Sequence, residues 1–213
     1  NFTKYFYKKF PYFKNEFVPT KEYIAGEKSE VDWAGDVIEW LDPLTGKINK
    51  SYVFVGCLCY SQLLFARAYV SMKQNDFMKG HEDFFNYCSG TTKIIIPDNA
   101  KTAVIKADKF DPEINPEYFN FTKHYDVSVV PARVYSPKDK ALVEGCVKII
   151  MRYFKWRNRR HTFTSVLEIN LALEVVIAEI NNKIHTRFKV SRQELFLTEE
   201  KSKLKTLPAE KYN

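Results

Sequence analysis

The chain contains no run approaching the roughly 18 consecutive apolar residues that a membrane-spanning helix needs. It also does not begin with the charged stretch, apolar stretch and small-residue cleavage site of a secretory signal peptide. The first residue is asparagine and not methionine, from which we expect a fragment or a trimmed product. These absences exclude a membrane-spanning protein and favour one that acts in the cytoplasm.

Cysteine and histidine are too few and too widely spaced for a zinc module or a disulfide scaffold. The 4 cysteines form no CxxC motif, and the 4 histidines show no zinc-ligand spacing, alone or with cysteine. Cys57 and Cys59 lie in the apolar run 52–60, whose alternation places both on one face of a strand. Buried free thiols in a reducing compartment are the interpretation that we favour.

What the chain does contain is enough apolar surface for a core. It has 213 residues, of which 45% are hydrophobic and 28% charged, so disorder of the whole chain is excluded. The length fits one large domain, or one domain with appended arms.

Positive charge is concentrated in one part of the chain. The net charge is +7, and residues 133–192 alone carry 13 basic and 5 acidic side chains, whereas residues 1–132 carry 16 and 17. Such a local excess suggests a polyanion such as nucleic acid, although a solvated surface that only keeps the protein soluble has the same composition.

The first part of the chain predicts an arm and then three strands. Residues 1–25 are aromatic and basic without a clean period, and we expect an extended arm or linker. Residues 29–41, 51–60 and 63–71 are rich in β-branched and aromatic residues, and the last two are separated by only two residues. They predict an antiparallel meander.

Helices and short strands follow. Asn75 or Asp76 is expected to cap a helix, and the short apolar segments 93–96 and 126–130 predict two strands on either side of an irregular segment, 101–121. Two longer helices are expected after them, opened by capping boxes at Ser136 and at Ser165. This order predicts an α/β fold of the ribonuclease H-like type. It is a mixed five-stranded sheet, three antiparallel and then parallel strands, with helices on both faces.

Three acids lie where this fold would bring them together. Asp32 is within the first strand, Asp98 follows the strand 93–96, and Glu144 lies in the helix that Ser136 opens. An acid inside a strand costs desolvation unless it is paired, and the carboxyl ends of parallel strands are a usual ligand site. Three converging carboxylates need a cation among them, and oxygen ligands suit two Mg²⁺ or Mn²⁺ ions for phosphoryl transfer.

Each acid also has an ordinary structural interpretation. Asp32 could pair with a lysine, and Asp98 could be a turn residue of the Pro-Asp-Asn type. Glu144 could pair with Lys140 and Lys148, four residues before and after it, in a solvated ladder of ion pairs.

The motifs around the three acids resemble a known family. They are GEKSEVDWAG at 26–35, IPDNAKTAV at 96–104, PARVYSPKDKALVEGCVKII at 131–150 and INNKIHTRFKVSRQELF at 180–196. In this order they resemble the catalytic core of IstA-type insertion-sequence transposases, of the DDE transposase and retroviral integrase superfamily. The resemblance implies that Asp32, Asp98 and Glu144 are the catalytic triad and hold the metal ions. It also implies 26–197 as the catalytic domain and 198–213 as a linker toward a further domain.

Cations surround Glu144 on the predicted helix. Lys140, Glu144, Lys148 and Arg152 recur every four residues, with Lys155 close by, and Arg133 and Lys138 precede the helix. We expect these cations to contact DNA phosphates, although surface charges that serve only solubility are the alternative. By the resemblance, Lys148 lies at the position of an integrase lysine that contacts the viral DNA end.

The resemblance implies a bacterial DNA transposase that carries out metal-dependent 3′-end processing and strand transfer. Its implied partners are double-stranded DNA of the transposon ends and target, a second copy of itself or more, and an IstB-type AAA+ ATPase helper. Two alternatives stay open: a structure-selective nuclease of the same fold, and a non-catalytic module for DNA binding or assembly.

Overall fold

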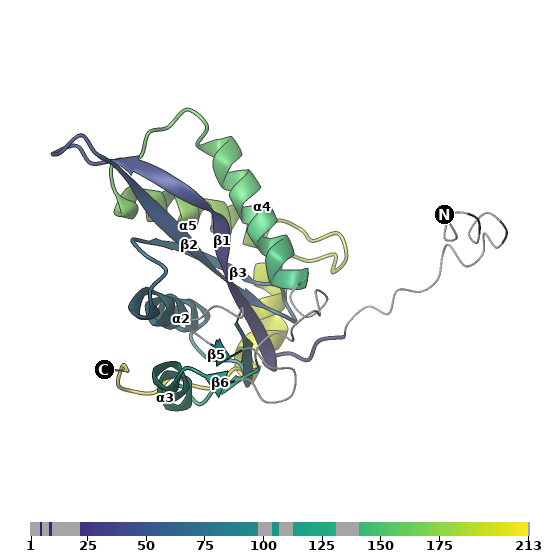
Figure 1. The fold of residues 1–213 in the computed structure, drawn as a ribbon. Helices are drawn as coiled ribbons and strands as arrows, with labels where there is room; N and C mark the ends of the chain where they lie inside the picture. The colour runs from purple at the N-terminus through teal and green to yellow at the C-terminus, as the bar shows by residue number, and fades with distance from the viewer. Residues whose placement is uncertain are drawn as a thin grey trace.

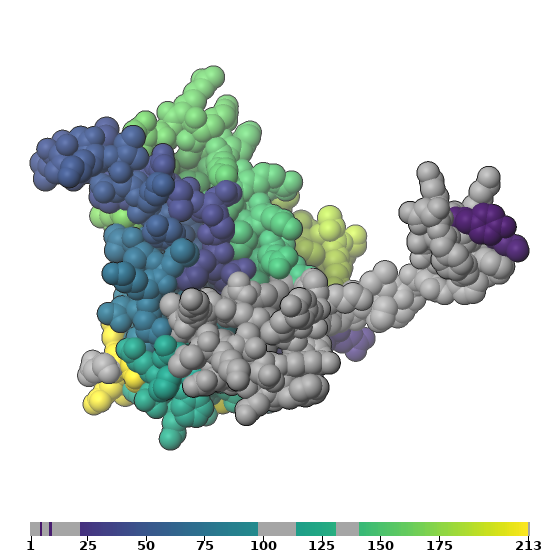
Figure 2. Space-filling model, viewed as in Figure 1, coloured from purple at the N-terminus to yellow at the C-terminus, as the bar shows by residue number. Residues whose placement is uncertain are grey.

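Three antiparallel strands form the frame of the molecule, as predicted. The computed structural model describes Tyr5, Lys9 and residues 22–97, 104–106, 113–130 and 141–212. The strands are β1 (Lys28–Leu41), β2 (Ile48–Leu58) and β3 (Leu64–Tyr69). Asp32 of β1 pairs with Val55 of β2, and a register shift follows between Trp33 and Val37. The β1–β2 hairpin projects from the body of the molecule (Figures 1 and 2).

Two short strands complete the main sheet. They are β4 (Ile94–Ile96) and β7 (Ser128–Val129), and the described strands are ordered β3-β2-β1-β4-β7. β4 runs parallel to β1 with Glu30 opposite Ile96, and β7 runs parallel to β4. The predicted mixed sheet, antiparallel first and then parallel, is confirmed.

Helices cover both faces of this sheet (Figure 1). α2 (Gln74–Cys88) and α3 (Pro116–His124) bury their apolar side chains with one face of the sheet. α4 (Ala141–Arg157) and α5 (Val166–Asn182) do so on the other face. Each face therefore has its own apolar core, and burial of these side chains is the main stabilising contribution.

The expectation that 101–121 is irregular is wrong in part, because α3 begins at Pro116 and two short strands lie before it. The Asn115 side chain accepts hydrogen bonds from the amides of Glu117 and Tyr118, at 3.0 and 3.3 Å. Asn at the cap and Pro at the first helical position are a known start signal. A small hairpin of β5 (Val104–Lys106) and β6 (Glu113–Ile114) precedes α3.

The expected cap of α2 is also wrong. The helix begins at Gln74, and its N-cap residue, Lys73, makes no capping hydrogen bond with its side chain. The Asp76 carboxylate instead accepts hydrogen bonds from the backbone amide and hydroxyl of Ser71, at 2.9 and 2.5 Å. The acid fastens the preceding loop to the first turn of the helix. The Ser165 half of the second capping box is confirmed, since the Ser165 hydroxyl accepts a hydrogen bond from the Glu168 amide at 3.1 Å. The Glu168 carboxylate accepts a hydrogen bond of 2.7 Å from the amide of Thr164, one residue before the predicted partner.

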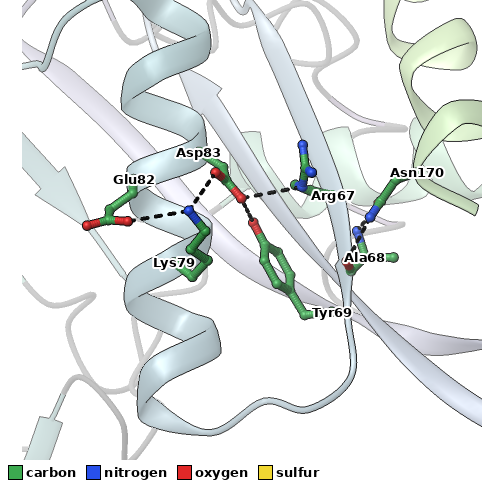
Figure 3. A network of polar contacts seen from close by, with 7 residues as sticks. All are labelled: Arg67, Ala68, Tyr69, Lys79, Glu82, Asp83 and Asn170. Atoms are coloured by element: carbon green, nitrogen blue, oxygen red, sulfur yellow. Dashed lines mark hydrogen bonds and ion pairs between the residues drawn. The ribbon is translucent and has the colours of Figure 1, made fainter. Parts of the chain in front are cut away.

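The edge strand β3 is held by side chains from both faces (Figure 3). From α2, the Asp83 carboxylate accepts a hydrogen bond of 2.7 Å from the Tyr69 hydroxyl and pairs with Arg67 and Lys79, each at 3.3 Å. From α5, the Asn170 amide bonds the backbone of Ala68.

The segment after α5 packs on the domain. It comprises α6 (Arg192–Leu195), η3 (Phe196–Glu200) and η4 (Lys201–Lys203), and Lys205 forms a β-bridge with Thr91. Three apolar side chains beyond residue 203 pack against the α2 core: Leu204, Leu207 and Tyr212. Residues 198–212 thus contact the core along their length, and the presence of a further domain beyond them stays a prediction.

Residues 1–25 fall largely outside the described residues: of the predicted arm, the structure describes Tyr5, Lys9 and residues 22–25. Within the described residues, no helix is long and apolar enough to cross a membrane.

Candidate active site

Asp32 faces the side of the sheet that α4 covers. Side chains alternate along β1, so Glu30, Asp32 and Ala34 share one face. Ala34 packs in the core formed with α4 and α5, whereas Val31 packs in the core formed with α2. Asp32 is half-buried, and its Oδ1 accepts a hydrogen bond of 2.9 Å from the amide of Trp33.

Glu144 lies in the first turn of α4, with its side chain exposed. Its neighbours Val143 and Cys146 are buried against the sheet. The backbone amide of Val143 donates a hydrogen bond of 2.9 Å to Glu30 Oε2. The turn that carries Glu144 is therefore attached to β1 two residues before Asp32.

Asp98 lies outside the described residues. The last described residue before it is Pro97, directly after β4, the parallel neighbour of β1. In the described part of the chain, His, Cys, Asp and Glu side chains form no group of three or more that could hold a metal ion. The structure thus places two members of the predicted triad on contacting elements and leaves the third undescribed.

The cations of α4 lie on its exposed face. Lys148 and Arg152 are exposed, one and two turns after Glu144. Lys155 is also exposed, and it forms an ion pair of 2.7 Å with Asp36 of β1. The other three predicted DNA contacts lie outside the described residues: Arg133, Lys138 and Lys140.

The thiols beneath α4 serve packing. The Sγ atoms of Cys146 and Cys57 are 3.3 Å apart, and Cys59 Sγ lies 3.9 Å from Glu30 Oε1. All of these cysteines are buried and free, as predicted. Burial, and then the hydrogen bond with Cys146, raises the pKa of the Cys57 thiol well above its ordinary value. A protonated thiol is a poor nucleophile, so we assign Cys57 no chemical role.

Glu30 is a residue of this site that the sequence patterns did not point to. Its side chain is 1% exposed, although it is a glutamate in the middle of a sheet. The available signal was its position two residues before Asp32, which places both acids on one face of the strand.

Comparison with known proteins gives relatives among transposases. The chain is 37% identical over 194 residues to "Putative transposase y4uI" of Sinorhizobium fredii, covering 91% of this chain and 38% of the relative. It is 31% identical over 125 residues to "Transposase for insertion sequence element IS21" of Pseudomonas aeruginosa, covering 58% of this chain and 31% of the relative. The match thus spans about a third of the length of these relatives. No family model matches it.

Solved structures decide the fold. The chain superposes on a chain of the simian T-cell lymphotropic virus intasome with a TM-score of 0.65 and 14% identity, covering 91% of this chain and 61% of that one. It superposes on the HTLV-2 integrase catalytic core in complex with magnesium with a TM-score of 0.56 and 11% identity, covering 83% and 99%. This is the fold of integrase catalytic cores. The predicted ribonuclease H-like architecture is confirmed, and the resemblance to insertion-sequence transposases is supported by the names of the relatives.

Proposed function

We propose that this chain is the catalytic domain of an IstA-type DNA transposase of the DDE class, which processes transposon 3′ ends and joins them to target DNA. The observation that carries the proposal is the attachment of the Glu144 turn to β1, two residues before Asp32, within an integrase-core fold. The similarity to transposases of insertion sequences supports it.

The third acid follows from the pairing of β1 and β4. Glu30 of β1 is opposite Ile96 of the parallel strand β4. Asp32 comes two residues after Glu30, and Asp98 comes two residues after Ile96 in the sequence. Equal steps along neighbouring parallel strands lead to both aspartates, so we assign Asp98 to the same site.

The three carboxylates suit divalent metal ions. Asp32, Asp98 and Glu144 would supply oxygen ligands only, which Mg²⁺ and Mn²⁺ prefer, and we propose two ions per site. Bound ions would stabilise the charge that develops on the attacking and leaving oxygens of phosphoryl transfer. The HTLV-2 integrase core was solved with magnesium.

The exposed face of α4 would bind the DNA backbone beside the site. Lys148 and Arg152 extend in line from Glu144, and we propose that Arg133, Lys138 and Lys140 add further phosphate contacts. Lys155 would contribute less, because Asp36 already neutralises part of its charge.

Joining two transposon ends to one target requires more than one catalytic site. We therefore propose that the protein acts on DNA as a homodimer or higher oligomer, in the bacterial cytoplasm, with an IstB-type AAA+ ATPase as its helper. HTLV-2 integrase cores have been described in dimeric and trimeric forms.

Strand transfer by the full-length protein tests the assignment. Asp32→Asn and Glu144→Gln should each lower the rate of joining of an end-bearing DNA duplex by at least about 100-fold, because each removes a charge that a metal ion needs. Glu174→Gln on α5 makes the same kind of change at an exposed position and should leave the rate unchanged. Wild-type rates in the first two variants would refute the proposal.

The same assay separates the alternatives. Hydrolysis of DNA without any joined product, with either Mg²⁺ or Mn²⁺, would favour a nuclease. DNA binding without cleavage, together with no carboxylate-dependent Mn²⁺ binding in calorimetry, would favour a non-catalytic module.

A further inference from the structure

We infer that Glu30 is a positioning residue for Glu144, because its carboxylate fixes the first turn of α4 on the strand that carries Asp32. This inference rests on the proposed function, since it assumes that Asp32 and Glu144 act together. It assigns a role to a side chain that is itself buried away from DNA.

The contact between the two elements is direct and buried. Glu30 is 1% exposed and Val143 is fully buried, and the Val143 amide lies 2.9 Å from Glu30 Oε2. Glu144 is the next residue in the helix, so its backbone position follows that of Val143. The hydrogen bond therefore fixes the backbone position from which the exposed Glu144 side chain extends.

A glutamate at this place needs a specific reason. Acidic residues are depleted in strands, and burying a carboxylate costs several kcal/mol unless it is hydrogen-bonded. A hydrogen bond from a backbone amide to a carboxylate is stronger than one between neutral groups, and the first turn of a helix favours a nearby negative charge. An apolar side chain would fill the same space, but it would not hold α4 in one position relative to β1.

The strand β1 thus carries one proposed metal ligand, Asp32, and also Glu30, which holds the helical turn of a second proposed ligand, Glu144. Glu30 and Asp32 are two residues apart on one face of β1, about 7 Å along the strand. At the far end of α4, Lys155 and Asp36 form an exposed ion pair, and exposed pairs contribute little to stability because water screens their charges. The Glu30 contact is therefore a stronger polar attachment of α4 to β1 than the Lys155–Asp36 pair.

Activity measurements with three variants of the full-length protein test this role. Glu30→Met keeps the length of the side chain but removes the acceptor, and should lower the rate of strand transfer about 10–100-fold. The Mg²⁺ concentration for half-maximal activity should rise, while affinity for DNA should stay within about twofold, because the Glu30 side chain is buried. Glu30→Gln keeps an oxygen that accepts the Val143 bond, and should restore most of the activity. Glu39→Ala, at an exposed position on the same strand, is the control.

Hydrogen exchange gives a readout that does not depend on activity. In the wild type, the Val143 amide should exchange slowly, and in Glu30→Met exchange across residues 141–147 should be at least about 10-fold faster. Glu30→Gln should resemble the wild type. Rapid exchange of Val143 in the wild type would overturn the inference even if Glu30→Met fails to fold.

The outcomes distinguish this inference from the proposed function. If Asp32→Asn abolishes strand transfer but Glu30→Met has wild-type rates and Mg²⁺ response, only the role of Glu30 is refuted. If Glu30→Gln is as defective as Glu30→Met, the charge matters and not the acceptor, and the inference is also refuted.

Discussion

At the scale of single residues, a second buried glutamate holds distant segments together. Glu200 is fully buried, and its carboxylate accepts hydrogen bonds from the backbone amides of Gly26 and Ser61, at 3.2 and 3.0 Å. It joins the C-terminal segment to the start of the sheet and to the β2–β3 connection. Burial raises its pKa above the ordinary value of 4.5, and the hydrogen bonds from Ser61 and Gly26 oppose that rise.

We predict that Glu200→Ala lowers the free energy of unfolding by about 3 kcal/mol, because two buried amides lose their acceptor. Glu199→Ala is the matched control, since Glu199 is exposed and accepts a hydrogen bond from the Tyr60 hydroxyl. The control should change the free energy by less than about 0.5 kcal/mol. Urea denaturation measures both, and equal effects would contradict the assignment.

Stability should depend on pH through the same residue. Because the pKa of Glu200 is higher in the folded state than in the unfolded state, its protonation adds stability below the unfolded value. That contribution is lost as the pH rises through the folded value. The difference in unfolding free energy between the wild type and Glu200→Gln should therefore fall as the pH rises from about 4 to about 7. A difference that increases over this range would mean that the pKa is lowered.

At the scale of elements, α5 closes the exposed edge of the sheet. The Asn170 side chain bonds both the amide and the carbonyl of Ala68, at 2.7 and 3.1 Å. Asn181 bonds the amide and the carbonyl of Leu64, at 3.0 and 2.8 Å. Each asparagine amide takes the place of a neighbouring strand. Unpaired edge groups would otherwise be available to the edge of another molecule.

We predict that Asn181→Leu lowers the free energy of unfolding by about 3 kcal/mol, because the amide and carbonyl of Leu64 lose their partner. It should also promote association that depends on protein concentration, measurable by light scattering. Asn182→Leu, at the adjacent exposed position, is the control and should do neither. If Asn181→Leu were as stable as the control and associated no more than the control does, the edge strand β3 would not need the Asn181 side chain.

At the scale of the whole molecule, the cations on the two faces of the sheet have different surroundings. On α2, Lys79 pairs with Glu82 and Asp83. On the other face, Lys148 and Arg152 extend from Glu144 along α4. The α4 face is therefore the one on which a phosphate backbone would gain most.

The salt dependence of DNA binding by the full-length protein tests this assignment. In Lys148→Ala combined with Arg152→Ala, the slope of log affinity against log salt should become shallower by about 2, because two phosphate contacts are lost. Lys79→Ala on α2 removes one charge on the opposite face and should leave the slope unchanged. If the slope became shallower in Lys79→Ala by about half as much as in the double variant, in proportion to the charge removed, DNA binding would follow net charge and not the α4 face.

Local patterns in the sequence were sufficient for the strands and for two of the acids. The alternation and β-branched content of residues 29–71 predicted β1, β2 and β3, because a strand places successive side chains on opposite faces. Asp32 stood out because an acid inside such a strand is unusual, and the structure places it on the α4 side. The sequence signal for the start of α3 was equally local, since Asn115 followed by Pro116 favours the start of a helix. The prolines of this segment nevertheless led us to expect an irregular structure.

Contacts between distant residues were decided only by the tertiary structure. Glu30 and Val143 are 113 positions apart, and Asn181 and Leu64 are 117 apart. No local period encodes either pair, because each depends on how α4 and α5 lie across the sheet. The sequence by itself therefore determined the strands β1, β2 and β3 and the helices α4 and α5, and which acids could act in them. The packing of helices on the sheet decided which buried side chain holds the Glu144 helix in place, because a buried carboxylate is stable only where a donor meets it.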